Sequence, residues 1–265
     1  MKLRWVALVA LLLLIFFLPL LAVLLGAFSP RWVFPDLLPR ELSFRGVLFL
    51  RSNSRAVIRA LGSSLRYSLA SVVTAFLLCL GPAEVLARYR FRGRLAVEAL
   101  LLSPVLIPAI TWALGLSVVL IRVGLADTFP GVVIVLTAAS YPYMLRALIA
   151  GFQQLPRDYR ACAVNLGASP LRQTLLVTIP MLMPAIVAGG TVVFLVAFSD
   201  YFLVFLVGGG AVQSFTGYLF PYLSAADYTI GSTLTLLFLL VPMTLFGLIE
   251  LTVGRWHRRW GQTGG

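Results

Sequence analysis

Long apolar runs, separated by short basic stretches, set the pattern of this chain. A helix that crosses a bilayer needs roughly 20 mainly apolar residues, because the hydrocarbon core is about 30 Å thick and the helix rises about 1.5 Å per residue. The pattern therefore predicts an all-α integral membrane protein with six transmembrane helices, the fourth being the shortest: 5–28, 67–87, 99–121, 128–145, 183–207 and 228–249.

The first apolar run has two interpretations. Lys2 and Arg4 precede it, as basic residues precede the apolar core of a secretory signal peptide. Against this, the run 5–28 is longer than the roughly 7–15 residues of such a core, and no small-residue cleavage pattern follows it cleanly. We expect an uncleaved first span.

Composition agrees with a membrane protein and excludes other classes. Hydrophobic residues make up 60% of the chain and charged residues only 11%, too few for the charged shell of a soluble domain. The net charge of +12 falls between apolar runs rather than on one polar face, so we expect anionic lipid and no nucleic acid as its partner. One histidine and two cysteines without metal-site spacing offer nothing for a zinc site or a histidine-dependent protease.

The basic residues also predict an orientation. With six spans, both termini lie on the same side as the loops that follow the second and fourth spans. That side carries the larger share of arginine and lysine, including four arginines within 88–94, so we expect it to be cytoplasmic.

The first external loop departs from this rule because it also carries six arginines. Apolar positions in its segment 46–61 recur at helical spacing, which predicts an interfacial helix whose arginines extend outward to water. The arginines of this loop are Arg31, Arg40, Arg45, Arg51, Arg55 and Arg59. The positions on the predicted helical face are Val47, Leu50, Ser54, Val57, Ile58 and Leu61.

The loop between the fourth and fifth spans is the most informative stretch. Pro156 suits the first turn of a short helix, and Gly167 suits the end of that helix. Ser169 before Pro170 suits the cap of a second helix. The sequence predicts two short cytoplasmic helices joined by a tight turn.

The same loop resembles the cytoplasmic signature of binding-protein-dependent ATP-binding-cassette (ABC) permeases, which reads E-A-A, three residues, G, nine residues, I-x-L-P. The positions that match this spacing are Ala163, Gly167, Val177, Ile179 and Pro180. In such permeases the first short helix of the loop couples the membrane spans to the ATPase.

Two positions of the signature differ. The glutamate of the family falls on Ala161 and its first alanine on Cys162, so the usual acidic side chain is missing there. Asp158 and Arg160 lie within a turn of that position. The resemblance assigns ATPase coupling to one set of residues: Asp158, Arg160, Ala161, Cys162, Ala163, Gly167 and Pro180.

Further stretches at 63–65, 87–93 and 103–108 are similar to permeases of the spermidine/putrescine type. The resemblance implies a type I ABC importer permease fold with a core at 62–253, preceded by a first helix and external loop at 1–61 and followed by a cytoplasmic tail at 254–265. It also implies a multi-pass protein of the cell inner membrane, with polyamine as the substrate guess.

The partners that the resemblance implies are an ABC ATPase dimer, a second permease subunit, identical or homologous, and an extracytoplasmic solute-binding protein. The chain has no G-x-x-x-x-G-K-[ST] phosphate loop. We therefore expect no enzyme activity and no cofactor in this chain, with ATP and Mg used by partner subunits.

Asp200 is the ionisable residue of most interest within the predicted spans, because a charge in the bilayer is costly unless it faces a cavity or a partner. Ser199, Asp200 and Tyr201 would offer a hydroxyl, a carboxylate and an aromatic face to a cationic solute, and are our candidate path-lining residues. The alternative is an interfacial anchor or a gate hydrogen bond. Glu84 and Glu98 are expected to pair with the arginines of 88–94.

Three other functions were weighed against import by an ABC system. An ion-gradient-driven secondary transporter is the main alternative, but the chain shows no visible inverted repeat and no series of buried acids. A membrane enzyme would need clustered Asp or His at the membrane surface. A structural scaffold leaves the spacing of the loop signature unexplained.

Overall fold

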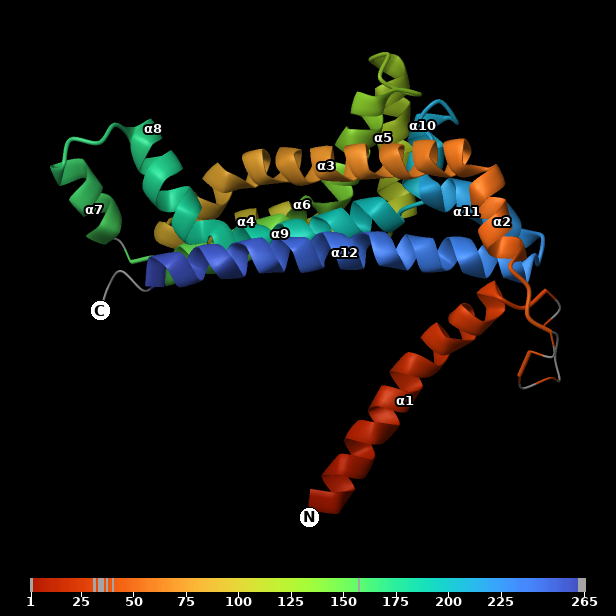
Figure 1. Ribbon diagram of the computed structural model, residues 1–265. Coiled ribbons are helices and arrows are strands. Elements are labelled where there is room, and N and C mark those ends of the chain that lie inside the picture. The colour runs from red at the N-terminus through yellow and green to blue at the C-terminus, as the bar shows by residue number, and fades with distance from the viewer. Residues whose placement is uncertain are drawn as a thin grey trace. The chain divides into compact units, whose positions relative to one another are not determined.

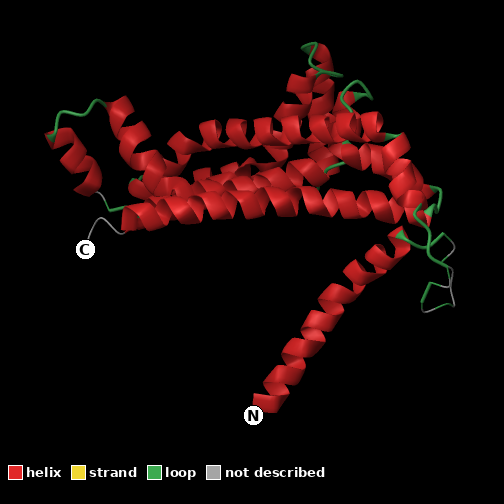
Figure 2. Cartoon of the chain, viewed as in Figure 1, coloured by secondary structure: helices red, strands yellow, loops and turns green. Residues whose placement is uncertain are grey.

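The computed structural model describes residues 2–30, 32, 36, 38–39, 41–156 and 158–261, so that Arg31, Arg40 and Arg157 lie outside the described residues. Every regular element within the described ranges is helical (Figure 2). The chain divides into two compact units, one made of residues 1–61 and 215–265 and the other of residues 62–214. The expected all-α fold is confirmed.

The first unit holds an apolar helix, two short helices and one long helix (Figure 1). Its core is a cluster of buried side chains that includes Val57, Phe215 and Leu234. Its elements are α1 (Lys2–Ala27), α2 (Arg45–Ser52), the first turns of α3 (Ser54–Arg88), α11 (Phe215–Ser224) and α12 (Tyr228–Gly261).

Helix α1 meets α12 through small residues and hydroxyls near its C-terminal end. A Cβ on Gly26 would lie 2.7 Å from the Ser232 Oγ, and the Thr229 hydroxyl donates to the Ser29 carbonyl at 2.5 Å. The described side chains of residues 11–18 are all exposed apolar groups. Such a surface fits lipid contact rather than water.

The second unit contains the rest of α3 and every helix from α4 to α10. Two clusters of buried side chains link the helices, one around Tyr67, Val135 and Ala197 and the other around Cys79, Met144 and Leu182. Its elements after α3 are α4 (Arg94–Leu102), η1 (Ser103–Val105), α5 (Ala109–Arg122), α6 (Phe129–Gln154), α7 (Asp158–Asn165), α8 (Pro170–Gln173), the π-helical η2 (Thr174–Thr178), α9 (Ile179–Ser199) and α10 (Phe202–Gly208).

Helices α6 and α9 approach closely because small residues line their contact. A Cβ on Gly151 would lie 2.6 Å from the Ala185 Cβ, and one on Gly189 would lie 2.9 Å from the Ala147 Cβ. Real Cβ atoms essentially never come within 3.0 Å of a neighbour. Small residues that let helix backbones approach in this way are typical of helix pairs in membranes.

The described residues contain fewer candidate spans than the six that the sequence pattern predicts. In the described residues, four helices are long and apolar enough to cross a bilayer, and a fifth crosses if the bent pair Arg94–Val105 and Ala109–Arg122 is one span. The described apolar part of α1, Leu11–Ala27, is shorter. The six-span count therefore stays a prediction.

Three predicted helices differ from the observed ones. The third span, predicted to be continuous over 99–121, bends by 93° between η1 and α5, where Pro108 interrupts helical hydrogen bonding. The fifth, predicted over 183–207, ends at Ser199 and resumes as α10. The predicted interfacial helix 46–61 is split at Asn53 into α2 and the start of α3.

The predicted apolar face of 46–61 is also divided. Val57 is 4% exposed and belongs to the core of the first unit, whereas Ile58 is 67% exposed. Adjacent helical residues point about 100° apart, so the core covers Val57 and leaves Ile58 outside. The residues that follow α2 therefore pack into a core, and the interfacial interpretation of α2 stays a prediction.

Candidate functional site

The loop between α6 and α9 forms the short helix and turn that its sequence predicts. Helix α7 ends at Asn165, and Gly167 follows in the left-handed region with φ of +75°. The Ala168 N–H then donates to the Ala163 carbonyl at 3.0 Å, which closes the helix end. Glycine adopts this conformation without the steric cost that other residues pay.

The second helix of the loop is not separate, which corrects the prediction. Ser169 caps it by accepting from the Arg172 N–H at 3.5 Å, and Pro170 occupies its first turn. However, α8 continues through η2 into α9, so that Pro170–Ser199 is one helix of 30 residues. The second helix of the loop is therefore continuous with a candidate membrane span.

A π-helical turn marks this junction. The Ile179 N–H donates to the Thr174 carbonyl, five residues back, just before Pro180. Proline has no N–H and its ring crowds the carbonyl four residues earlier, which accounts for the widened turn. Pro180 thus sits between the α7–α8 loop and the long helix, the position that its place in the signature implies.

Gln173 also holds the turn and was missed by the sequence reasoning. Its side chain is 6% exposed, and its Nε2 donates to the Ala168 carbonyl at 2.7 Å. A glutamine outside the signature spacing carries no sequence signal for this role. Its contact depends on the turn at Gly167.

The residues predicted to couple to an ATPase divide between the packed and the exposed face of α7. Ala163 is 8% exposed, whereas Cys162 is exposed. Asp158 is exposed, and the side chains of Arg160 and Ala161 lie outside the described ones.

Exposed apolar side chains gather on this loop. Tyr159, Val164 and Leu166 are 53%, 55% and 87% exposed, and Leu171 at the start of α8 is 68% exposed. A short polar connection would not present four large apolar groups to water. Exposed apolar surfaces of this kind are typical of sites that contact another protein or lipid.

The three candidate path residues are not brought together. The Asp200 Oδ1 accepts from the Leu203 N–H at 2.7 Å, so this carboxylate caps α10. The Ser199 Oγ donates back to the Leu195 carbonyl at 2.7 Å, and the Tyr201 ring stacks on another ring of α10. Asp200 lines a cavity to which Ser199 and Tyr201 do not contribute.

That cavity has a volume of about 330 Å³ and lies against the bend between η1 and α5. Trp112 and Tyr143 add an indole and a phenol to the carboxylate of Asp200. These two aromatic residues were missed by the sequence reasoning because they are far from Asp200 in sequence: Trp112 lies on α5, just after the bend, and Tyr143 lies on α6. The lining contains no basic residue: Pro104, Val105, Leu106, Ile107, Pro108, Ala109, Trp112, Ala139, Tyr143, Val196 and Asp200.

The expected pairing of Glu84 is confirmed. Its Oε1 lies 3.8 Å from an Arg88 nitrogen one turn later on α3. The Arg88 guanidinium also lies 5.4 Å from the centre of the Phe152 ring on α6. The pairing expected for Glu98 stays a prediction.

Comparison with known proteins gives related permeases of several systems. The "Probable sulfate transport system permease protein cysT" of Nephroselmis olivacea is 30% identical over 178 residues, 62% of this chain and 63% of that protein. The "Molybdate/tungstate transport system permease protein WtpB" of Thermococcus kodakarensis is 31% identical, over 57% of this chain and 61% of that protein. The "Putrescine transport system permease protein PotI" of Escherichia coli (strain K12) is 27% identical, over 58% and 57%.

The matches thus span about three fifths of the length of these relatives. Among solved structures, the "Crystal structure of a bacterial ABC transporter involved in the import of the acidic polysaccharide alginate" matches with a TM-score of 0.74 and 16% identity, over 94% of this chain and 95% of that one. This likeness supports the type I permease fold. Residues 80–257 match the family described as "Binding-protein-dependent transport system inner membrane component", and the chain belongs to that family.

Proposed function

We propose that this chain is the membrane permease subunit of an ATP-driven ABC uptake system. One observation carries the proposal: the exposed helix α7 is joined through the Gly167 turn to a continuous 30-residue helix, Pro170–Ser199. In this proposal α7 docks in a cleft of the ATPase subunit. Closure of the ATPase on ATP would move α7, and the continuous helix would carry that movement into the membrane.

The partners are part of the proposal. ATP and Mg belong to an ATPase dimer, a second permease subunit completes the solute path, and a solute-binding protein delivers the solute outside. The apolar side chains exposed on α7 and α8 support the contact with the ATPase. The orientation follows from the basic residues, with both termini in the cytoplasm of the cell and the protein in the inner membrane.

For the solute, the cavity at Asp200 favours a cation over an oxyanion. It offers one carboxylate with two aromatic rings and no basic side chain, so sulfate or molybdate would meet repulsion without compensation. A polyamine fits this chemistry, as does another small cationic solute. The relatives serve systems of both charge types, so this inference depends on the cavity alone.

The test is co-purification of the chain with candidate ATPase and permease partners, followed by solute-dependent ATP hydrolysis in proteoliposomes. Gly167→Arg should remove the stimulation by loaded binding protein. Gly124→Arg is a matched control, because Gly124 also has a positive φ, of +72°, and open space around it, but lies outside the coupling loop.

The proposal fails if no ATPase associates and solute transport persists without ATP. An ion-gradient-driven secondary transporter would then be the better explanation. It also fails if Gly124→Arg and Gly167→Arg reduce the stimulation equally, since the loop would then have no special role. A panel containing putrescine, sulfate and a neutral sugar tests the preference for cations.

A further inference from the structure

Helix α2 lies level with the start of the span α12. The Arg45 guanidinium pairs with the Asp227 carboxylate at 2.6 Å, one residue before α12 begins. One residue later on α2, Gly46 packs against Thr233, and a Cβ there would collide with the threonine side chain. Since the candidate span runs over Tyr228–Ile249, these contacts place α2 at the boundary of the membrane.

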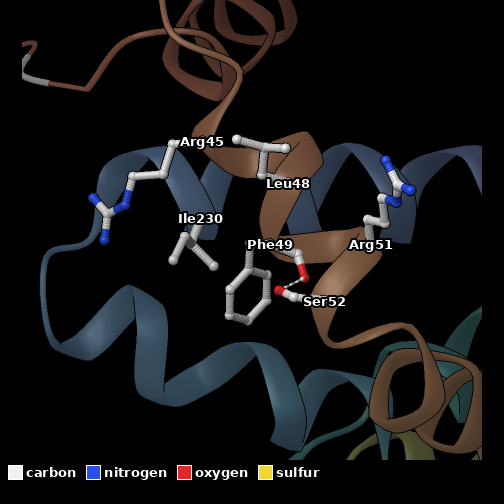
Figure 3. A pocket seen from close by; sticks show the side chains of 6 residues that line it. All are labelled: Arg45, Leu48, Phe49, Arg51, Ser52 and Ile230. Atoms are coloured by element: carbon white, nitrogen blue, oxygen red, sulfur yellow. Dashed lines mark hydrogen bonds between the residues drawn. The ribbon is translucent and has the colours of Figure 1, made fainter.

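A groove runs between α2 and α12 at this level (Figure 3). Its volume is about 770 Å³, with Phe49 and Ile230 between two arginines, Arg45 and Arg51. The remaining lining residues are Leu48, which is 62% exposed, and Ser52. The groove thus combines an apolar floor with a cationic group at each end.

The charge of the groove is positive. Asp227 offsets Arg45, but no acidic residue lines the groove beside Arg51, and none occurs between 45 and 61. Arg55 and Arg59 follow on the first turns of α3 and are exposed as well. This is the basic loop that departs from the usual charge asymmetry of membrane proteins.

We propose that this groove binds an anionic phospholipid, with its phosphate at Arg51 and the start of an acyl chain over Leu48 and Phe49. A guanidinium binds phosphate through paired N–H groups, and lipid phosphates lie at the depth where α2 is held. The proposal explains why arginines gather at this end of the spans. It requires only that the chain is in a membrane and does not depend on the proposed transport function.

Lipid fits better than a soluble anion or a protein because of the apolar neighbours. Phe44 and Val47 are 69% and 49% exposed, next to Leu48. A soluble phosphate would leave these groups in water. Acyl chains at the membrane boundary would cover them, as they do on interfacial amphipathic helices.

The test measures lipid retention by the purified full-length chain, using native mass spectrometry and the unfolding temperature in detergent. Phosphatidylglycerol, phosphatidylcholine and inorganic phosphate are added separately. The wild type should retain phosphatidylglycerol preferentially, and Arg51→Gln should lower that retention about fivefold, as expected for losing one arginine near an anionic surface. Leu48→Ser should weaken retention of both lipids. The matched control is Arg122→Gln, which removes an exposed arginine outside the groove.

Several results would overturn the proposal. Equal retention of the two lipids, or equal loss in Arg51→Gln and Arg122→Gln, would show that no specific lipid site exists. Protection by inorganic phosphate equal to that by phosphatidylglycerol would indicate a site for a free anion. Retention of phosphatidylglycerol by Arg51→Gln at the wild-type level would show that the lipid phosphate does not bind at Arg51.

Discussion

The α6–α9 pair and the α7–α8 loop both depend on glycine, for opposite reasons. Gly151 and Gly189 lie where a Cβ would come within 3.0 Å of the facing helix, so space requires them. Gly167 has nothing within 4 Å of a Cβ, but its φ of +75° is unfavourable for other residues. The α6–α9 contact therefore depends on side-chain packing, whereas the α7–α8 loop depends on its backbone conformation. The outer face of the loop stays exposed, where we propose that a partner binds.

The largest effect is expected from filling the α6–α9 contact. In Gly189→Leu the new side chain would start 2.9 Å from the Ala147 Cβ and 3.1 Å from the Met144 Cα, and a backbone atom cannot move aside cheaply. Overpacking of this kind costs about 1–3 kcal/mol, and a leucine lies at or above the upper end. We expect a large loss of monodisperse protein in detergent and a lower unfolding temperature for what remains.

Gly115→Ala is the control for this change. Gly115 lies within α5 and has nothing within 4 Å of a Cβ, so alanine should leave stability unchanged or raise it by up to about 1 kcal/mol. If Gly189→Leu unfolds at the wild-type temperature, α6 and α9 are not in close contact and the space argument is wrong.

Much of this contrast could be predicted from the sequence. Apolar runs located the long helices, and the spacing around Gly167 and Ser169 predicted the short helix and its turn. These features depend on local rules of burial, capping and backbone conformation. The role of Gly189 could not be inferred, because its constraint comes from Ala147 and Met144 on another helix.

The breaks within the spans were also missed. Apolar residues occur on both sides of the bend before Ala109 and of the break at Asp200, so an apolar run continues through each break and does not locate it. Pro104 and Pro108 were the sequence features that could have predicted the bend. The cavity that joins Asp200 to Trp112 depends on that bend, which is why the sequence singled out Ser199 and Tyr201 instead.

A smaller effect is expected at the far end of α9. Asp200→Ala removes the cap of α10 and should lower stability by about 1 kcal/mol, while Asp200→Asn keeps a capping oxygen and should cost less. Both variants remove the carboxylate from the cavity and should reduce uptake of a cationic solute. Thermal unfolding of the two variants measures the capping role of Asp200, and uptake assays measure the role of its charge. Normal uptake of a cationic solute by Asp200→Asn would show that Asp200 does not line the solute path.

At the turn of the loop, Gly167→Ala should affect coupling more than stability. Alanine in the left-handed region costs about 1–2 kcal/mol, but no neighbour is displaced and the strain stays within the loop. We expect a small fall in the unfolding temperature and a proportionally larger loss of stimulation of ATP hydrolysis. Gly167→Asn, which tolerates this conformation better, should fall between alanine and the wild type; equal stimulation in all three would show that the turn conformation does not matter.

Labelling of the two cysteines compares the buried core with the exposed loop and needs no substitution in the chain. Cys79 is buried in the core beside α6, whereas Cys162 is exposed on α7. A maleimide should therefore label one site rapidly in the folded protein and the second only after unfolding, without changing the unfolding temperature. Cys162→Ser should remove the rapid phase, which assigns it, and Cys79→Ser should leave it intact.

Binding of the ATPase should then slow labelling of Cys162, because the proposed docking helix would be covered while the α6–α9 region stays as it was. Rapid labelling of Cys79 in the folded chain would contradict the buried core. Unchanged labelling of Cys162 in a complex that hydrolyses ATP would place the ATPase contact elsewhere. The exposed apolar groups around α7 would then need a different partner, since water alone does not favour them.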